Sequence, residues 1–155
     1  MINLPEKFIF RTGFGQSDHQ LGAFDQALLQ AGIGNYNLVK VSSILPPRCS
    51  LQSEITLSAG ALLPSAYATI FATDIGSTIS AAVAVGIPSD PSRAGVIMEY
   101  SAFSSSAEAE RIVRTYAKEA MQIRNLIIKE IFSASVEVVV ESDAVYCAFA
   151  TVSMW

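Results

Sequence analysis

The sequence predicts an α/β (α+β) fold, a layered αββα sandwich of mainly antiparallel strands with two main helices. Three observations lead to this prediction. Strand-like segments dominate the 155 residues, only two segments have helical spacing, and these two lie far apart in the chain. No repeat, linker or low-complexity segment divides the sequence, so residues 1–155 are expected to form a single domain.

Apolar segments bounded by Gly, Pro, Ser and Asp predict the strands, about eight in number. In chain order they are residues 8–12, 35–44, 54–57, 66–73, 78–86, 95–103, 135–140 and 145–152. Residues 12–15 (Thr-Gly-Phe-Gly) are predicted to form a turn, because they lack the third glycine and the helix spacing of a phosphate-binding loop.

The first helix is predicted to begin at Ser17, since Ser17 and Gln20 form a capping-box pattern, and to stop at Gly32. Its apolar face is expected to comprise Leu21, Phe24, Leu28 and Ala31. Asp25 lies four residues after Leu21 and shares that face. A carboxylate there needs a partner, a ligand or a path to solvent.

The second helix is predicted to begin at another capping box, formed by Ser105 and Glu108. Apolar residues at helical spacing continue through this segment and predict the face that packs on the sheet. These residues are Ile112, Val113, Tyr116, Ala120, Ile123 and Ile127.

Composition limits the possible functions. Hydrophobic residues make up 51% of the chain and the formal net charge is −4, which argues against nucleic-acid binding. The longest apolar segment, residues 58–73, is interrupted by Pro64 and is shorter than the roughly 20 residues of a membrane-spanning helix. The apolar surplus therefore predicts packing against other subunits in a homo-oligomer, and a dense sheet that is buried on both faces would give the same composition.

The N-terminal segment MINLPEKFIF has no basic region followed by a long apolar stretch, so no signal peptide is expected. Cys49 and Cys147 have no motif spacing and are expected to be free thiols in a reducing cytoplasm. His19 is the single histidine and cannot form a metal cluster, so no metal site is predicted.

The most informative segment is Lys40-Val41-Ser42-Ser43-Ile44-Leu45-Pro46-Pro47. Two adjacent serines stand at the end of an apolar strand and just before a rigid double proline, which cannot continue a ladder. By composition alone this is a strand that runs into a turn. A Ser-Ser pair by itself does not indicate a function.

The surroundings of this pair resemble a known family. The Val-Ser-Ser-Ile segment, the preceding Asn37, the helical Asp25 and the later Glu99 are similar in type and spacing to the self-processing site of pyruvoyl-dependent arginine decarboxylases. The resemblance extends over most of the chain, from about residue 12 to residue 155.

The resemblance implies a self-made cofactor. The hydroxyl of Ser43 would attack the carbonyl of Ser42, with Asn37 stabilising the oxyanion, and the chain would be cut into a β chain of residues 1–42 and an α chain of residues 43–155. Ser43 would become a covalent pyruvoyl group. This group would form a Schiff base with L-arginine and decarboxylate it to agmatine and CO2.

The resemblance also implies the roles of three further residues. Glu99 would be the proton donor, and its apolar neighbours should raise its pKa. Asp25 would pair with the guanidinium of arginine, and Leu28 would contact the methylenes of the substrate. In the family the site lies between subunits of a trimer. Without the resemblance, Asp25 would be read as a carboxylate at the edge of the apolar stripe that reaches solvent, whereas Glu99 fits a solvent-facing side chain of an edge strand and a functional carboxyl equally well.

Two alternatives stay open at this point. A pyruvoyl-dependent decarboxylase of another amino acid, such as histidine, would also be cut at a Ser-Ser pair, but it would have less need of Asp25. An uncleaved, non-catalytic binding homologue would keep the chain in one piece. The number of bands on a denaturing gel separates the uncleaved homologue from both enzymes.

Overall fold

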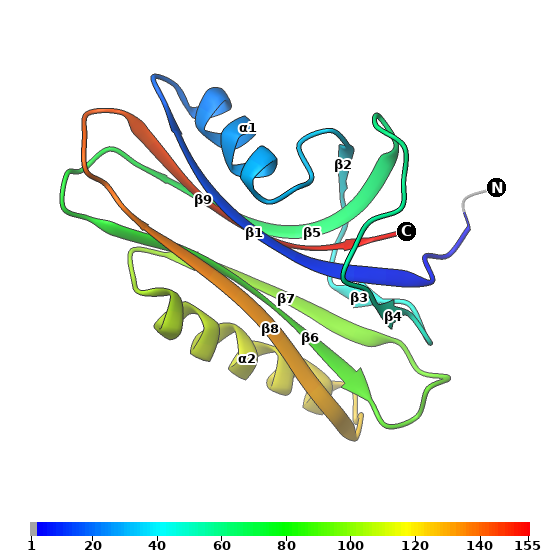
Figure 1. Cartoon of the computed structure of the whole chain (residues 1–155). Helices are drawn as coiled ribbons and strands as arrows, with labels where there is room; N and C mark the ends of the chain where they lie inside the picture. Colours follow the sequence, from blue (N-terminus) through cyan, green and yellow to red (C-terminus); the bar gives the residue numbers. More distant parts are fainter. Residues whose placement is uncertain (1–2) are drawn as a thin grey trace.

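The computed structural model describes residues 3–155. Two β-sheets pack face to face, and each carries one helix on its outer side (Figure 1). Helix α1 (Gln20–Gln30) covers the first sheet and helix α2 (Ser106–Ile123) covers the second. The predicted αββα sandwich with two main helices is therefore confirmed.

The sheets are formed by segments that are distant in the sequence. The first has the strand order β2-β5-β9-β1-β4 and the second has the order β3-β7-β6-β8. The strands are β1 (Lys7–Ser17), β2 (Asn37–Lys40), β3 (Ile44–Leu45), β4 (Ser50–Leu51), β5 (Leu62–Ala72), β6 (Thr78–Pro88), β7 (Gly95–Ala102), β8 (Ile128–Val139) and β9 (Val145–Met154). Neighbouring strands are antiparallel except for the pairs β1–β4 and β2–β5.

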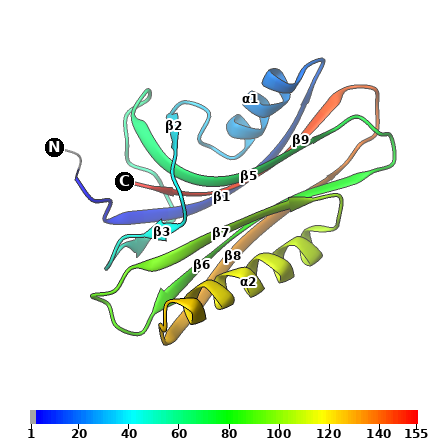
Figure 2. The ribbon, with the colours of Figure 1, turned by 180° about the vertical axis from the view of Figure 1, so that it is seen from behind.

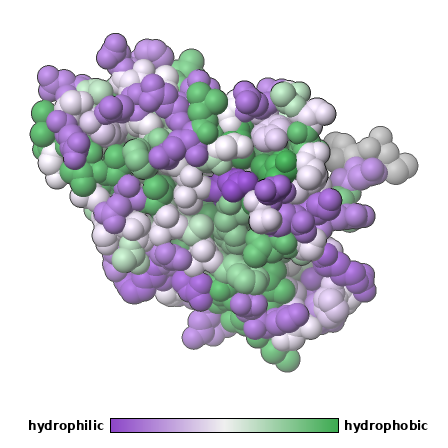
Figure 3. Space-filling model, in the orientation of Figure 1, coloured by the Kyte–Doolittle hydropathy of each residue, from purple (hydrophilic) through white to green (hydrophobic). Residues whose placement is uncertain are grey.

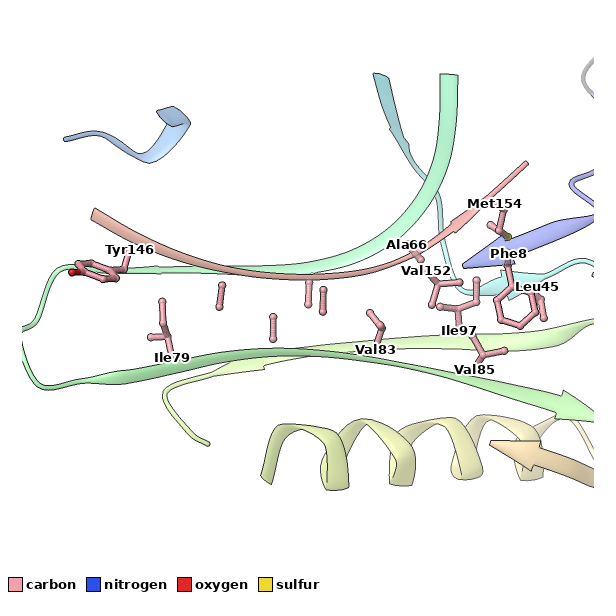
Figure 4. Packing of buried hydrophobic residues seen from close by; sticks show 14 of the residues in the cluster. Phe8, Leu45, Ala66, Ile79, Val83, Val85, Ile97, Tyr146, Val152 and Met154 are labelled. Atoms are coloured by element: carbon pink, nitrogen blue, oxygen red, sulfur yellow. The ribbon is translucent and has the colours of Figure 1, made fainter. Parts of the chain in front are cut away.

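The main core fills the space between the sheets. Side chains such as Ile79, Val83 and Val152 are fully buried there and point toward the opposite sheet (Figure 4). Two smaller clusters lie under the helices, one between α1 and the first sheet and one between α2 and the second. Strand β6 is buried on both faces, which explains its nearly continuous apolar sequence.

The predicted turn at residues 12–15 is wrong, because these residues continue strand β1. The two glycines serve the packing of α1 instead. A Cβ atom on Gly15 would lie 2.5 Å from the carbonyl oxygen of Ala23, and one on Gly13 would lie 2.9 Å from the backbone nitrogen of Ala31. Glycine therefore allows the helix backbone to approach the strand.

The predicted start of the first helix at Ser17 is also wrong. Ser17 ends strand β1, and the N-cap is His19, whose Nδ1 accepts a hydrogen bond from the backbone N–H of Gly22. Of the predicted apolar face, Leu28 and Ala31 are buried and Phe24 packs against them, but Leu21 is 75% exposed, and Ala23 and Ala27 complete the buried face. The small buried residues follow from the close approach of this helix to β1.

The second capping box is confirmed, because the hydroxyl of Ser105 accepts a hydrogen bond from the backbone N–H of Glu108. Val113 and Ala120 are buried as predicted, but Ile123 is 78% exposed and Ile127 lies beyond the end of the helix. The buried face is Ala109, Val113, Ala117, Ala120 and Met121.

The predicted strand at residues 54–57 is wrong, since this part of the described chain is irregular. Ile55 and Leu57 pack into the cluster beneath α1, so their apolar character serves packing rather than strand pairing. The predicted strand at residues 35–44 is divided into β2 and β3, which belong to different sheets. None of the described helices has the length and hydropathy needed to cross a membrane.

Candidate active site

The Ser42-Ser43 pair lies where the chain passes from one sheet to the other, between β2 and β3 (Figure 2). Just before the pair, the backbone N–H of Val41 donates to the carbonyl of Ser65 on β5, in the first sheet, at 3.1 Å. Within the pair, the carbonyl of Ser43 accepts from the N–H of Ile97 on β7, in the second sheet, at 2.7 Å. The peptide bond between the two serines is thus held from both sheets.

The two serine hydroxyls remain available for reaction. Among residues 3–155, no hydrogen bond involves the side chain of Ser42 or Ser43. Ser43 is half-buried, so its hydroxyl is close to solvent without being fully surrounded by it. The hydroxyl of Ser43 and the carbonyl of the preceding Ser42 lie in one segment whose two ends are restrained, and this arrangement is suited to a reaction within the backbone.

Glu99 lies on β7, two residues after Ile97, whose N–H fixes Ser43. Its side chain is exposed in the single chain, yet neighbouring protein atoms displace part of the water around the carboxyl and raise the pKa of Glu99 above its ordinary value. The positive charge of Lys40 acts in the opposite direction and lowers that pKa. The net increase favours a protonated carboxyl, as a proton donor requires.

Glu99 lies on β7 between two residues, Ile97 and Ser101, that hydrogen-bond to segments outside the second sheet or leading to it. Two residues further along β7, the hydroxyl of Ser101 donates to the carbonyl of Thr69 on β5 at 3.3 Å. We call residues 41–43, Glu99, Ser101 and Thr69 the seam. In this region β5 and β7 are connected by the hydrogen bonds from Val41 to Ser65, from Ile97 to Ser43 and from Ser101 to Thr69.

Lys40 is a residue near the seam that the sequence interpretation gave no role. It ends strand β2, and its Nζ lies 4.4 Å from the centroid of the Tyr67 ring, which is a cation–π contact. Its charge acts on Glu99. The available signal in the sequence was a cation at the end of an otherwise apolar strand, three residues before Ser43.

Asp25 and Leu28 are neighbours on α1, three residues apart, but they differ in exposure. Leu28 is buried in the cluster beneath the helix, where Tyr67 and Phe24 also pack. Asp25 is exposed, and among the described residues it makes no hydrogen bond or ion pair. Its carboxylate is therefore free to accept a ligand, but it is not in contact with Ser43 or Glu99 within one chain.

Asn37 lies at the first residue of β2, and its side-chain amide donates to the carbonyl of Gly60 at 2.8 Å. An extended strand advances about 3.3 Å per residue, so the length of β2 alone separates Asn37 from Lys40 by about 10 Å. One chain thus does not place Asn37 beside the carbonyl of Ser42. Its role in oxyanion stabilisation stays a prediction.

The single chain therefore brings together Ser42, Ser43, Glu99 and Lys40, and leaves Asp25 and Asn37 apart. A hollow of about 560 Å³ is lined by other residues, including Phe14, Gln26 and Glu137, and a second of about 640 Å³ is lined by residues such as Leu4 and Pro47. Neither Ser43 nor Glu99 lines these two hollows.

The fold and these residues fit the class of enzyme predicted from the sequence, a decarboxylase that uses a pyruvoyl group. Residues 7–154 match the family model of pyruvoyl-dependent arginine decarboxylase. A protein of that name from Methanocaldococcus jannaschii is 43% identical over 99% of this chain and 92% of its own length. Those from Methanococcus aeolicus and Pyrococcus abyssi are 42% and 40% identical, each over 97% of this chain and over 90% and 96% of their own lengths.

The chain belongs to the pyruvoyl-dependent arginine decarboxylase family. The predicted family, enzyme class and pyruvoyl cofactor are therefore confirmed. The two alternatives, a decarboxylase of another amino acid and a non-catalytic homologue, are not favoured by these matches.

Proposed function

We propose that the protein decarboxylates L-arginine to agmatine and CO2, with a pyruvoyl group that it makes from Ser43 by cutting the Ser42–Ser43 bond. The observation that carries this proposal is the geometry of the crossing segment. In a chain of this family, Ser43 has a free hydroxyl and a carbonyl fixed by Ile97.

The processing reaction is a sequence of bond exchanges within the backbone. The Oγ of Ser43 attacks the carbonyl carbon of Ser42, and the amide becomes an ester with the amine of residue 43 released. Loss of the Cα proton of residue 43 then breaks its Cβ–O bond and leaves a carboxylate on Ser42. Water converts the remaining dehydroalanine into a ketone and ammonia. The bonds from Val41 to Ser65 and from Ile97 to Ser43 support this step by restraining both ends of the segment.

A pyruvoyl group, once formed, supplies a carbonyl that accepts the electrons left behind when CO2 departs. The chain itself must then deliver a proton. Glu99 is the group that we assign to this role, because partial desolvation raises its pKa and β7 holds it beside the segment that contains Ser43.

We assign Asp25 to the guanidinium of arginine and Leu28 to its methylenes. A carboxylate offers two oxygens to the guanidinium fork, and the carboxylate of Asp25 is free among the described residues. Because Asp25 does not contact Ser43 within one chain, it would reach the pyruvoyl group of a neighbouring subunit. We therefore propose a trimer of αβ units with active sites between subunits, in which Asn37 also acts across the interface.

The surface around Asp25 supports such an interface. Leu21 and Leu29 are 75% and 52% exposed, and they lie four residues on either side of Asp25 on the same face of α1. Figure 3 shows further hydrophobic residues at the surface of one face of the molecule. Exposed apolar side chains around an unpaired carboxylate are what a subunit interface with a polar ligand requires.

We also propose a cytoplasmic location. Cys49 and Cys147 are both free thiols, and burial raises the pKa of the Cys49 thiol to about 11. Thiols that stay protonated and unpaired fit a reducing compartment.

Denaturing gel electrophoresis and an assay of released CO2 test the proposal together. Purified protein is expected to give two bands of about 4.5 and 12 kDa, in proportion to chains of residues 1–42 and 43–155, in place of one band at 16.6 kDa. CO2 should be released from arginine and not from histidine, and borohydride should abolish the release by reducing the carbonyl group. An intact chain after prolonged incubation would overturn the processing step.

A further inference from the structure

Lys40 has a defined position beside the bond that we propose is cut. It is the last residue of β2, opposite Ser65 in the parallel pairing with β5, and two residues before Ser42. Its Nζ lies over the Tyr67 ring at 4.4 Å from the centroid. Lys40 is exposed, and the contact with the ring of Tyr67 on β5 restrains its long side chain.

The ammonium group of Lys40 has no anionic partner of its own. Among residues 3–155 the one ion pair joins Arg111 to Glu108 on α2, and the Nζ of Lys40 makes no hydrogen bond. The carboxyl that senses its charge is Glu99, whose pKa desolvation raises and Lys40 lowers, and Lys40 makes no ion pair with it. Lys40 therefore offers three N–H donors and a positive charge on a residue three positions before Ser43, where this charge acts on Glu99.

The substrate carries a group that none of the proposed roles accommodates. In the proposed site, Ser43 provides the carbonyl for the α-amine of arginine and Asp25 pairs with its guanidinium. The α-carboxylate needs a cation, since the other two side chains of the site, Asp25 and Glu99, are acids. A lysine ammonium forms a charge-assisted hydrogen bond with a carboxylate.

We infer that Lys40 binds the α-carboxylate of the substrate and thereby distinguishes the amino acid from its amine product. This inference rests on the proposed function. Arginine and agmatine share the amine and the guanidinium and differ in the carboxylate alone. When CO2 leaves, the contact with Lys40 is lost, so the product is held less tightly than the substrate.

Three variants test the inference in processed protein. Lys40→Met keeps most of the apolar stem and removes the charge, Lys40→Arg keeps the charge, and Lys118→Met removes an exposed lysine on α2 as a matched control. For each variant, KM and kcat for arginine and the inhibition constant of agmatine are measured.

Lys40→Met is expected to raise the KM for arginine about tenfold or more, the usual effect of losing a hydrogen bond to a charged group, with a much smaller change in kcat. Agmatine should inhibit that variant about as well as it inhibits the wild type. Lys40→Arg should restore most of the affinity for arginine, and Lys118→Met should match the wild type.

Equal effects on arginine and agmatine, or no effect on either, would overturn the inference. So would a variant in which only the pH dependence of kcat moves, because Lys40 would then act through Glu99. If Lys40→Met is not processed, Tyr67→Leu replaces it. Loss of the ring should raise the KM for arginine severalfold and leave the inhibition constant of agmatine unchanged. An unchanged ratio of arginine to agmatine affinity in Tyr67→Leu also overturns the inference.

The proposed function can fail separately. A wild-type chain that stays intact or releases no CO2 from arginine contradicts the proposed function itself. A wild type that is cut and active, combined with an unchanged ratio of arginine to agmatine affinity in the Lys40 variants, contradicts the role of Lys40 alone.

Discussion

Two positions on strand β7 share one face of the strand but have different surroundings. Ile97 is 1% exposed and belongs to the core between the sheets. Glu99, two residues further on, is exposed and has a raised pKa. Side chains two residues apart in a strand point to the same side, so the strand itself does not explain the difference.

The difference follows from how the two sheets meet. Around Ile97 the opposite sheet supplies apolar side chains such as Val152, which exclude water (Figure 4). At the seam the neighbouring groups are polar, for example the hydroxyl of Ser101 bonded to Thr69. The core excludes water from around the strands, whereas at the seam the hydroxyls of Ser42 and Ser43 make no hydrogen bond among residues 3–155. Four variants test this difference between core and seam, and their expected effects decrease from Ser43→Ala to Ile79→Val.

Ser43→Ala should abolish processing and activity completely, because it removes the attacking hydroxyl. The backbone bond from Ile97 to residue 43 is kept, so circular dichroism should show an unchanged fold. A gel should show one band at 16.6 kDa. Ser42→Ala is the control, which keeps the hydroxyl of Ser43 and should still be cut. Cleavage of the Ser43→Ala chain at this bond would disprove the assignment of the nucleophile.

Glu99→Gln should lower kcat by about 10²–10⁴, the usual contribution of a general acid, while processing continues. The pKa of Glu99 is raised, so the wild-type carboxyl keeps its proton at low pH and loses it as the pH rises through that pKa. The kcat of the wild type should therefore fall on the alkaline side, and this decline should be missing from the profile of Glu99→Gln. An identical alkaline decline in both proteins would assign it to another group.

Asp25→Asn should raise the KM for arginine about 10–100-fold, because the guanidinium loses its charged partner. Processing should proceed normally, since Asp25 does not contact Ser43 within one chain. Asp143→Asn, in the turn between β8 and β9, provides a matched control at an exposed site. Unchanged arginine affinity in Asp25→Asn would remove Asp25 from the guanidinium role.

Ile79→Val should lower the free energy of unfolding by about 1 kcal/mol, because it deletes one buried methylene from the core. Urea denaturation of the uncut Ser43→Ala chain, with and without this change, gives the measurement. In the processing-competent protein, Ile79→Val should leave both the gel pattern and the KM for arginine unchanged. A strong effect on processing would show that the core and the seam are not independent.

Local sequence patterns determined much of this protein. Apolar segments bounded by turn residues identified most of the strands, and Ser105 with Glu108 identified the start of α2, because these signals depend on residues that are close in the sequence. The Ser42-Ser43 pair, read with Asn37, Asp25 and Glu99, identified the family for the same reason, since residue types and intervals are properties of the chain itself.

Other features were decided by the tertiary structure alone. Gly13 and Gly15 appeared to form a turn, and only the approach of α1 shows why a strand contains them. The effect of the Lys40 charge on Glu99 depends on β2 and β7, which belong to different sheets. Burial, desolvation and charge proximity arise from contacts between residues distant in sequence, and no local period encodes which faces will meet.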